Sequence, residues 1–312
     1  MKIQDPNLTA ANLAERIAGE LLGDGSIVIT GINEIHHVEA GDICFVDHPK
    51  YYDSTLASTA SVILIDQAYD CPPGKALIVI SEPFTAYNNL VAHYQSKTNK
   101  PFAVASEYST CVNLKIGLRT RIAPGAQIGD YVTIGDDCII EANAVIGDHT
   151  SIGNGVFVGA NSVIGSRAFY FKRTADGYQP WDTGGRVILE DRVAIGPNCN
   201  IARGVSSDTV IGAGSKLDAL VQIGHDCKIG PNCLFAAQVG VAGNTTIGEW
   251  SILQGQVGIT QNLVIGPKTV VLAQSGIGKN LEGGKSYFGS PAQEARKAFK
   301  DLATLRMLNK KK

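Results

Sequence analysis

The chain has 312 residues, of which 44% are hydrophobic, only 18% are charged and 35 are glycine. That length allows one large domain or two of ordinary size, and the composition is typical of a large buried core with regular β-structure and many tight corners. The net charge of −2 gives no general basis for nucleic-acid binding, and the lack of a long apolar run or secretory h-region argues against membrane insertion and a signal peptide.

Residues 1–105 carry no sequence repeat, and we expect them to form a small α/β domain. A first helix is predicted between a capping Thr9 and Gly23, and a second over 83–94. Short strands are predicted at 26–30, 42–46, 61–65 and 76–80. A linker near 97–112 then leads to the second domain, which we place at 113–288.

An aliphatic or aromatic side chain recurs at every sixth residue from Ile116 to Ile277. The series has 24 positions, with an interruption after Ile164 and a slip of four residues before Ile211. Such hexapeptide repeats predict a mainly β fold, the parallel β-helix. Each unit supplies one short strand and one corner of a triangular prism, so three units make a coil and about eight coils are expected.

The residue four positions after each repeat aliphatic is also expected to point inward, and it is nearly always small. Cys138, Cys199, Cys227 and Cys233 fall there, so we predict that they are core residues, not ligands or nucleophiles. The seven cysteines show no C-x-x-C spacing, which favours a reducing, cytoplasmic setting. Glycine often follows the aliphatic, as at Gly117, and suits a tight corner where a Cβ would be costly.

Two further segments depart from the repeat. The interruption at Ser166–Arg186 contains five aromatic residues: Phe169, Tyr170, Phe171, Tyr178 and Trp181. It is either a loop packed on the prism wall or on a neighbouring subunit, or one wall of a binding cleft. Residues 289–312 form a basic C-terminal extension, with a helix expected from about Pro291 to Asn309. It is either a solvated helix with a frayed tail or a dock for an acidic partner protein.

His225 is the candidate general base within the repeat. Gly243 follows it by 18 residues, which is one coil, so the two backbones are expected to lie about 4.8 Å apart. An imidazole that accepts a proton from an attacking amine or hydroxyl, beside an amide that stabilises an oxyanion, suits acyl transfer. A lone histidine at a β-helix corner is, however, more often plain surface than a catalytic base. A metal site of the β-helix carbonic anhydrase type would need several converging histidines.

Several motifs are more specific than the plain repeat. The N-terminal part contains GDGSIVITG at 23–31 and Phe45-x5-Tyr51. The later part adds Gly185-Arg-Val-Ile-Leu189, Ile201-Ala-Arg-Gly204, Asp218, Val221-Gln-Ile-Gly-His-Asp226 and Gly289-Ser-Pro-Ala292. In this combination the chain resembles, over nearly its whole length, the UDP-3-O-acylglucosamine N-acyltransferases of lipid A synthesis.

The resemblance implies a left-handed parallel β-helix, an exception to the usual right-handed crossover, assembled as a homotrimer. It implies transfer of a 3-hydroxyacyl chain from acyl carrier protein to the 2-amino group of a UDP-sugar, with no metal and no cofactor. His225 matches the catalytic base and Gly243 the oxyanion donor, with Asp218 as a candidate to orient the base. The acidic carrier protein would give the basic C-terminal helix a purpose.

The resemblance also implies substrate-binding residues. Phe45 and Tyr51 match the aromatic residues that hold the uracil, since flat rings stack, and His48 lies between them. Gln222 and Arg203 lie in the motifs of the repeat and are further candidates for substrate contact.

The chain departs from the family pattern at Ala202, where an aspartate is usual, at Ala219 and His48, where asparagine is usual, and at Asn262, where a histidine is common. These departures keep two alternatives open. One is an acetyl-CoA-dependent acetyltransferase acting on another nucleotide sugar. The other is a catalytically diverged paralogue that binds without turnover. The small residues of Ala273–Gly278 predict room for a long acyl chain.

Overall fold

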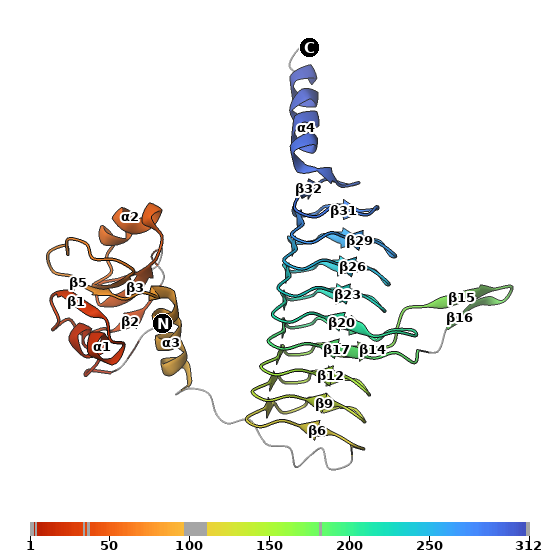
Figure 1. Ribbon diagram of the computed structural model, residues 1–312, viewed down its shortest axis with the longest axis horizontal. Helices are drawn as coiled ribbons and strands as arrows, with labels where there is room; N and C mark the ends of the chain where they lie inside the picture. The colour runs from red at the N-terminus through yellow and green to blue at the C-terminus, as the bar shows by residue number, and fades with distance from the viewer. Residues whose placement is uncertain are drawn as a thin grey trace. The chain divides into compact units, whose positions relative to one another are not determined.

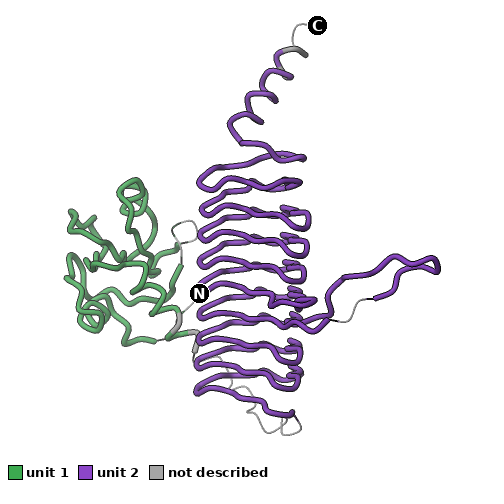
Figure 2. Tube along the Cα trace, turned by 45° about the vertical axis from the view of Figure 1, so that its right-hand side comes forward, with its two compact units in different colours: residues 1–101 green, residues 102–312 purple. Residues whose placement is uncertain are grey.

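The computed structural model describes residues 3, 5–33, 35, 38–96, 111–180 and 183–309. The chain divides into two compact units, residues 1–101 and 102–312 (Figure 2). Most of the predicted linker, Trp181 and the final lysines at 310–312 lie outside the described residues. Among the helices that are described, none is long and apolar enough to cross a membrane.

The N-terminal unit is a five-stranded sheet packed with short helices. Its strands are β1 (Glu20–Gly23), β2 (Gly31–Ile32), β3 (Asp42–Val46), β4 (Val62–Ile65) and β5 (Ala76–Val79), in the order β1-β5-β4-β3-β2. Its helices are α1 (Ala10–Arg16), the 3₁₀ turn η2 (Pro49–Tyr51), α2 (Tyr52–Leu56) and α3 (Pro83–Ser96). Strands β2 to β5 pair in parallel and β1 closes the edge antiparallel to β5, so the predicted α/β character is confirmed.

Two predicted elements of this unit were wrong. Thr9 does cap α1, accepting a hydrogen bond from the Asn12 N–H, but the helix ends at Arg16. The chain reverses at Ala18, whose φ is 54°, and Glu20–Gly23 pairs with β5 because an edge strand gains a full ladder there. The strand predicted at 26–30 is a single bridge between Val28 and Thr9.

The second unit is a parallel β-helix (Figure 1). One sheet holds β7 (Arg121–Ile122), β10 (Ile139–Ile140), β13 (Phe157–Val158), β18 (Ala194–Ile195), β21 (Lys216–Leu217), β24 (Leu234–Phe235), β27 (Ile252–Leu253), β30 (Val270–Val271), β32 (Ser286–Phe288) and β33 (Gln293–Glu294). The second holds β8 (Gln127–Ile128), β11 (Val145–Ile146), β14 (Val163–Ser166), β19 (Asn200–Ala202), β22 (Gln222–Ile223), β25 (Gly240–Val241), β28 (Gly258–Ile259) and β31 (Gly276–Ile277). The third holds β6 (Lys115–Ile116), β9 (Thr133–Ile134), β12 (Ser151–Ile152), β17 (Val187–Leu189), β20 (Thr209–Ile211), β23 (Lys228–Ile229), β26 (Thr246–Ile247) and β29 (Val264–Ile265). The two eight-stranded sheets confirm the predicted eight coils.

The interior of the β-helix follows the predicted pattern. The repeat aliphatics stack in register, as Ile140 does on Val158, and form one continuous core. Cys138, Cys199 and Cys227 are also buried at their predicted inward positions. Burial raises the pKa of the Cys227 thiol to about 11, so this sulfur is not a nucleophile.

Glycine is needed at the corners for a reason other than the expected tight turn. The left-handed backbone falls on the third residue after nearly every repeat aliphatic, for example at Asp137 and Asn143, with φ of 57° and 60°. The glycine directly after the aliphatic is needed for close stacking instead. A Cβ on Gly117 would lie 2.4 Å from the carbonyl carbon of Gly135 in the next coil.

The six-residue period fails twice between β6 and β31, and both times at the corner between the second and third sheets. After β14 the chain leaves the β-helix as a projecting hairpin of β15 (Phe171–Thr174) and β16 (Gly177–Pro180) before it returns at β17 (Figures 1 and 2). After β19, residues 203–208 form a shorter loop before β20.

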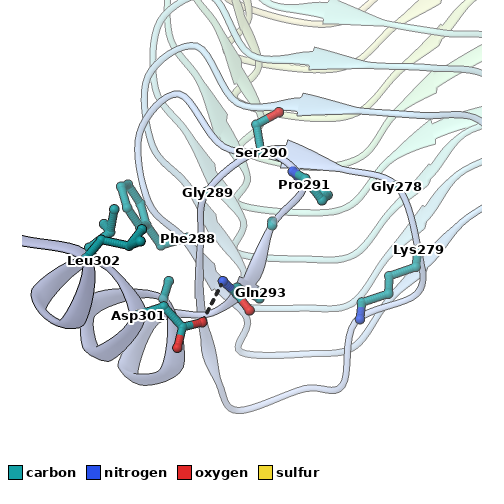
Figure 3. A pocket seen from close by; sticks show the side chains of 12 residues that line it. Gly278, Lys279, Phe288, Gly289, Ser290, Pro291, Gln293, Asp301 and Leu302 are labelled. Carbon is teal, nitrogen blue, oxygen red and sulfur yellow. Dashed lines mark hydrogen bonds between the residues drawn. The ribbon is translucent and has the colours of Figure 1, made fainter. Parts of the chain in front are cut away.

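The C-terminal end is capped by α4 (Ala295–Asn309), which begins later than expected because Gln293–Glu294 pairs as β33 with β32. Between the last coil and α4 lies a cavity of about 560 Å³ (Figure 3). Phe288 and Leu302 supply apolar lining, and Lys279 stands at its edge.

Candidate active site

His225 and Gly243 meet at the corner where both breaks of the period occur. Ile223 of β22 pairs with Val241 of β25, so the residues two positions beyond each strand are stacked. A Cβ on Gly243 would lie 2.3 Å from Nε2 and 2.5 Å from Cε1 of His225. The imidazole therefore lies directly over Gly243, as the spacing predicts.

The amide of Gly243 is open to a ligand. Its N–H has no hydrogen-bond acceptor within the described ranges. At equivalent corner positions the N–H groups of Asp130 and Asp136 bond to side-chain oxygens of Asp148 and Asn154 in the next coil, at 2.9 and 2.8 Å. The donor that a side chain caps at those two positions is left available at Gly243, beside the imidazole.

Asp226 holds the imidazole in place. Its Oδ2 lies 2.8 Å from Nδ1 of His225, and the two side chains are only 12% and 13% exposed. Burial opposes ionisation of Asp226, but hydrogen bonds from the Val205 N–H, from His225 and from the N–H and hydroxyl of Ser207 outweigh it and hold its pKa at about 2. A carboxylate charged at neutral pH attracts the proton to Nδ1, which leaves the Nε2 lone pair toward Gly243.

The expectation that Asp218 orients His225 is corrected by this geometry. Asp218 follows β21 at a different corner of the prism, where its carboxylate accepts a hydrogen bond from the Ala219 N–H at 2.7 Å. Asp226 takes the orienting place because it occupies the left-handed corner position, with φ of 59°, next to the histidine. The sequence feature that could have identified Asp226 is its place directly after His225 at a corner, where a short polar side chain can form a hydrogen bond with its neighbours.

Two cavities meet at His225. The first, of about 420 Å³, is polar and is lined by Ser206, Ser207, Asp226, Asn244, Gln261 and Asn262. The second, of about 570 Å³, has more apolar walls and is lined by Phe169, Asn200, Ala202, Gln222, Val241 and Ala242. His225 and Gly243 border both cavities, so a reacting group could be approached from either one.

Of the other candidate residues in the β-helix, one lies at this site and one does not. Gln222 lies in the second cavity, with its side-chain oxygen accepting a hydrogen bond from Asn200 at 2.9 Å. Arg203 instead turns along the corner toward earlier coils and donates to the carbonyl oxygen of Asp148 at 2.9 Å. Tyr170, to which no individual role was assigned from the sequence, packs on His225 with ring centroids 5.1 Å apart.

The N-terminal unit carries the candidate uracil-binding residues. Phe45 of β3 faces α3, with its ring 5.0 Å from that of Tyr87. Tyr51 is exposed on η2, where its ring lies 5.8 Å from that of His48 and 5.4 Å from the Lys50 ammonium. Tyr51 and His48 thus form an exposed pair, whereas Phe45 belongs to the packing of α3.

Comparisons with known proteins agree with both units. Residues 26–93 match the family described as UDP-3-O-(3-hydroxymyristoyl) glucosamine N-acyltransferase, LpxD, and residues 131–166 and 208–243 match the bacterial transferase hexapeptide family. The chain is 32% identical over 250 residues to a UDP-3-O-acylglucosamine N-acyltransferase of Anaeromyxobacter sp. (strain Fw109-5), covering 72% of this chain and 71% of the relative. It is 36% identical over 251 residues to a protein of that name from Coxiella burnetii (strain Dugway 5J108-111), with the same coverage.

The fold also has a solved counterpart. The structure of LpxA, a UDP-N-acetylglucosamine acyltransferase from Bacteroides fragilis 9343, matches with a TM-score of 0.54. That match has 24% sequence identity and covers 63% of this chain and 73% of the other. At this identity the likeness concerns the fold alone.

Proposed function

The chain belongs to the UDP-3-O-acylglucosamine N-acyltransferase family and is an acyltransferase of lipid A biosynthesis, and from this premise we propose that it moves a 3-hydroxyacyl chain from acyl carrier protein to the 2-amino group of a UDP-3-O-acylglucosamine. The observation that carries the proposal is the uncapped Gly243 N–H beside the Asp226-held imidazole. A base and an oxyanion donor that face the same space are what acyl transfer requires.

In this mechanism Nε2 of His225 accepts a proton from the attacking amine. The nitrogen adds to the thioester carbonyl, and the Gly243 N–H donates to the oxygen as it becomes negatively charged. Collapse of the tetrahedral intermediate breaks the C–S bond, and the imidazolium returns its proton to the leaving thiolate. Asp226, charged at neutral pH, stabilises the imidazolium between these two transfers.

The two cavities suggest an assignment of substrates. We assign the sugar to the polar cavity, where Asn244 and Gln261 offer amide groups to hydroxyls, and the acyl end of the donor to the less polar one. The uracil would stack on the exposed pair of Tyr51 and His48, and the basic helix α4 would receive the acidic carrier protein. We expect a homotrimer, working in the cytoplasm, where free thiols persist.

A second candidate is a related transferase with a different acceptor or donor, including an acetyl-CoA-dependent nucleotide-sugar acetyltransferase, or a paralogue without turnover. Two of the departures from the family pattern line the cavities at His225: Ala202 lines the second and Asn262 the first. Substitutions at these positions change the groups that a sugar or an acyl chain would meet.

The test is a mass-spectrometric assay of the purified protein with a UDP-3-O-acylglucosamine and 3-hydroxyacyl carrier protein, in parallel with the His225→Ala variant. A mass gain of one hydroxyacyl group that the variant abolishes supports the donor, the acceptor and the base together. Product from acetyl-CoA without carrier protein would favour the acetyltransferase. Binding of UDP-sugar without product from either donor would favour the paralogue.

A further inference from the structure

Tyr170 is delivered to His225 by the insertion between β14 and β17. Its ring meets the imidazole nearly edge-on, at a centroid separation of 5.1 Å and an interplanar angle of 73°. Phe169 of the same insertion lines the second cavity but makes no ring contact with His225, and Tyr178 of β16 is 74% exposed. Tyr170 itself is 44% exposed and lines the polar cavity beside His225.

This contact contributes to the shielding of His225 from solvent. The same corner position is exposed at Asp148 and Gln261 and half-buried at Asp130, Ser166 and Arg203 in other coils. The side chain of His225 is only 13% exposed, although it projects from the same corner. Gly243 lies beneath the imidazole, Asp226 beside it, and Tyr170 covers it on the side of the polar cavity.

We propose that Tyr170 is a positioning residue that keeps water away from the catalytic imidazole, so that the acyl thioester is attacked by the bound amine and not by water. The inference rests on the proposed function. The competing reaction uses the same groups: Nε2 accepts a proton from water, and the hydroxide oxygen adds to the thioester carbonyl. The C–S bond then breaks and the thiol leaves with the proton, giving a free hydroxy acid. Exclusion of water is a recognised means of preventing such hydrolysis.

The observed contact is between the two rings, so the ring of Tyr170 provides this cover. Tyr170→Phe should therefore behave as wild type. Tyr170→Ala should open the polar-cavity side of the imidazole, and Tyr170→Leu should lie between them. Tyr178→Ala is the matched control, because it removes a tyrosine from the same insertion at an exposed position.

The experiment measures N-acylated sugar and free 3-hydroxy acid by mass spectrometry in the same reaction, with 3-hydroxyacyl carrier protein as donor. We expect the ratio of hydrolysis to transfer to rise about tenfold or more in Tyr170→Ala and to stay unchanged in Tyr170→Phe and Tyr178→Ala. A purely structural role would lower both products together, and an unchanged ratio in Tyr170→Ala would overturn the proposal.

A second arm separates this inference from the proposed function. Donor alone, without sugar, is incubated with wild type, Tyr170→Ala and the Tyr170→Ala/His225→Ala double variant. Faster hydrolysis in Tyr170→Ala that disappears in the double variant supports the shield even where wild type makes no N-acyl product from the chosen sugar. Hydrolysis that does not rise, or that persists without His225, refutes it.

Discussion

Replacing Gly243 by alanine tests the pairing of imidazole and amide most directly. The new Cβ would lie 2.3 Å from Nε2 of His225, whereas ordinary contact begins at 3.4 Å. The imidazole, which Asp226 holds at Nδ1, would have to retreat by about 1 Å. Because a misplacement of ~1 Å can cost roughly 100-fold in rate, we expect kcat to fall by about two orders of magnitude. The KM for the UDP-sugar should change little if the uracil is held by the N-terminal unit.

Gly258→Ala is the matched control. Gly258 belongs to β28, and an added Cβ there meets no atom within 4 Å. Steady-state formation of the N-acyl product is measured for both variants, and their thermal midpoints and assembly sizes are compared with those of wild type. If Gly243→Ala formed product as fast as Gly258→Ala, the rate would depend neither on the position of the imidazole nor on the space over the Gly243 amide. That result would refute the proposed pairing of base and oxyanion donor.

Two further predictions concern charge and packing. Asp226→Asn should lower kcat by roughly 100-fold or more by losing the correct tautomer of His225, and at pH 7 it should also cost about 1 kcal/mol of stability after solvent screening. Since the pKa of Asp226 is depressed from 3.8 to about 2, that stability difference should vanish as pH falls through this window, which denaturant unfolding at several pH values can follow. Phe235→Ala should cost about 3–5 kcal/mol because the ring is fully buried, whereas Leu234→Ala, on the exposed face of the same strand, should stay within about 0.5 kcal/mol. Equal losses in thermal midpoint for these two would contradict the assigned core.

The β-helix was predictable because its rules are local and repeat along one axis. Once Ile116 and its successors set the register, every sixth residue must be buried and must stack on the residue one coil away. The N-terminal unit lacks such a rule. Leu21 reads as part of an amphipathic helix, but it is a strand residue because β5 offers a pairing edge that only the folded unit provides.

The contrast between repeat-determined and irregular segments also explains which site residues could be predicted. Periodicity places His225 over Gly243, since both positions are fixed by the coil. It does not say which way a corner side chain turns, so Asp218 was preferred although Asp226 makes the contact. The role of Tyr170 could not be predicted from the sequence, because the insertion that carries it follows no repeat. Only the three-dimensional path of that segment brings its ring to the imidazole.

The two breaks in the six-residue period have a consequence for how such a chain can encode recognition. A perfectly regular prism would present nearly the same surface at every turn, and a ligand could not distinguish one turn from the next. Both irregular segments, the hairpin after β14 and the loop at 203–208, emerge at the corner that bears His225. The regular coils thus provide a uniform scaffold, and the features that distinguish the reaction site from the other turns are the two segments that interrupt the repeat.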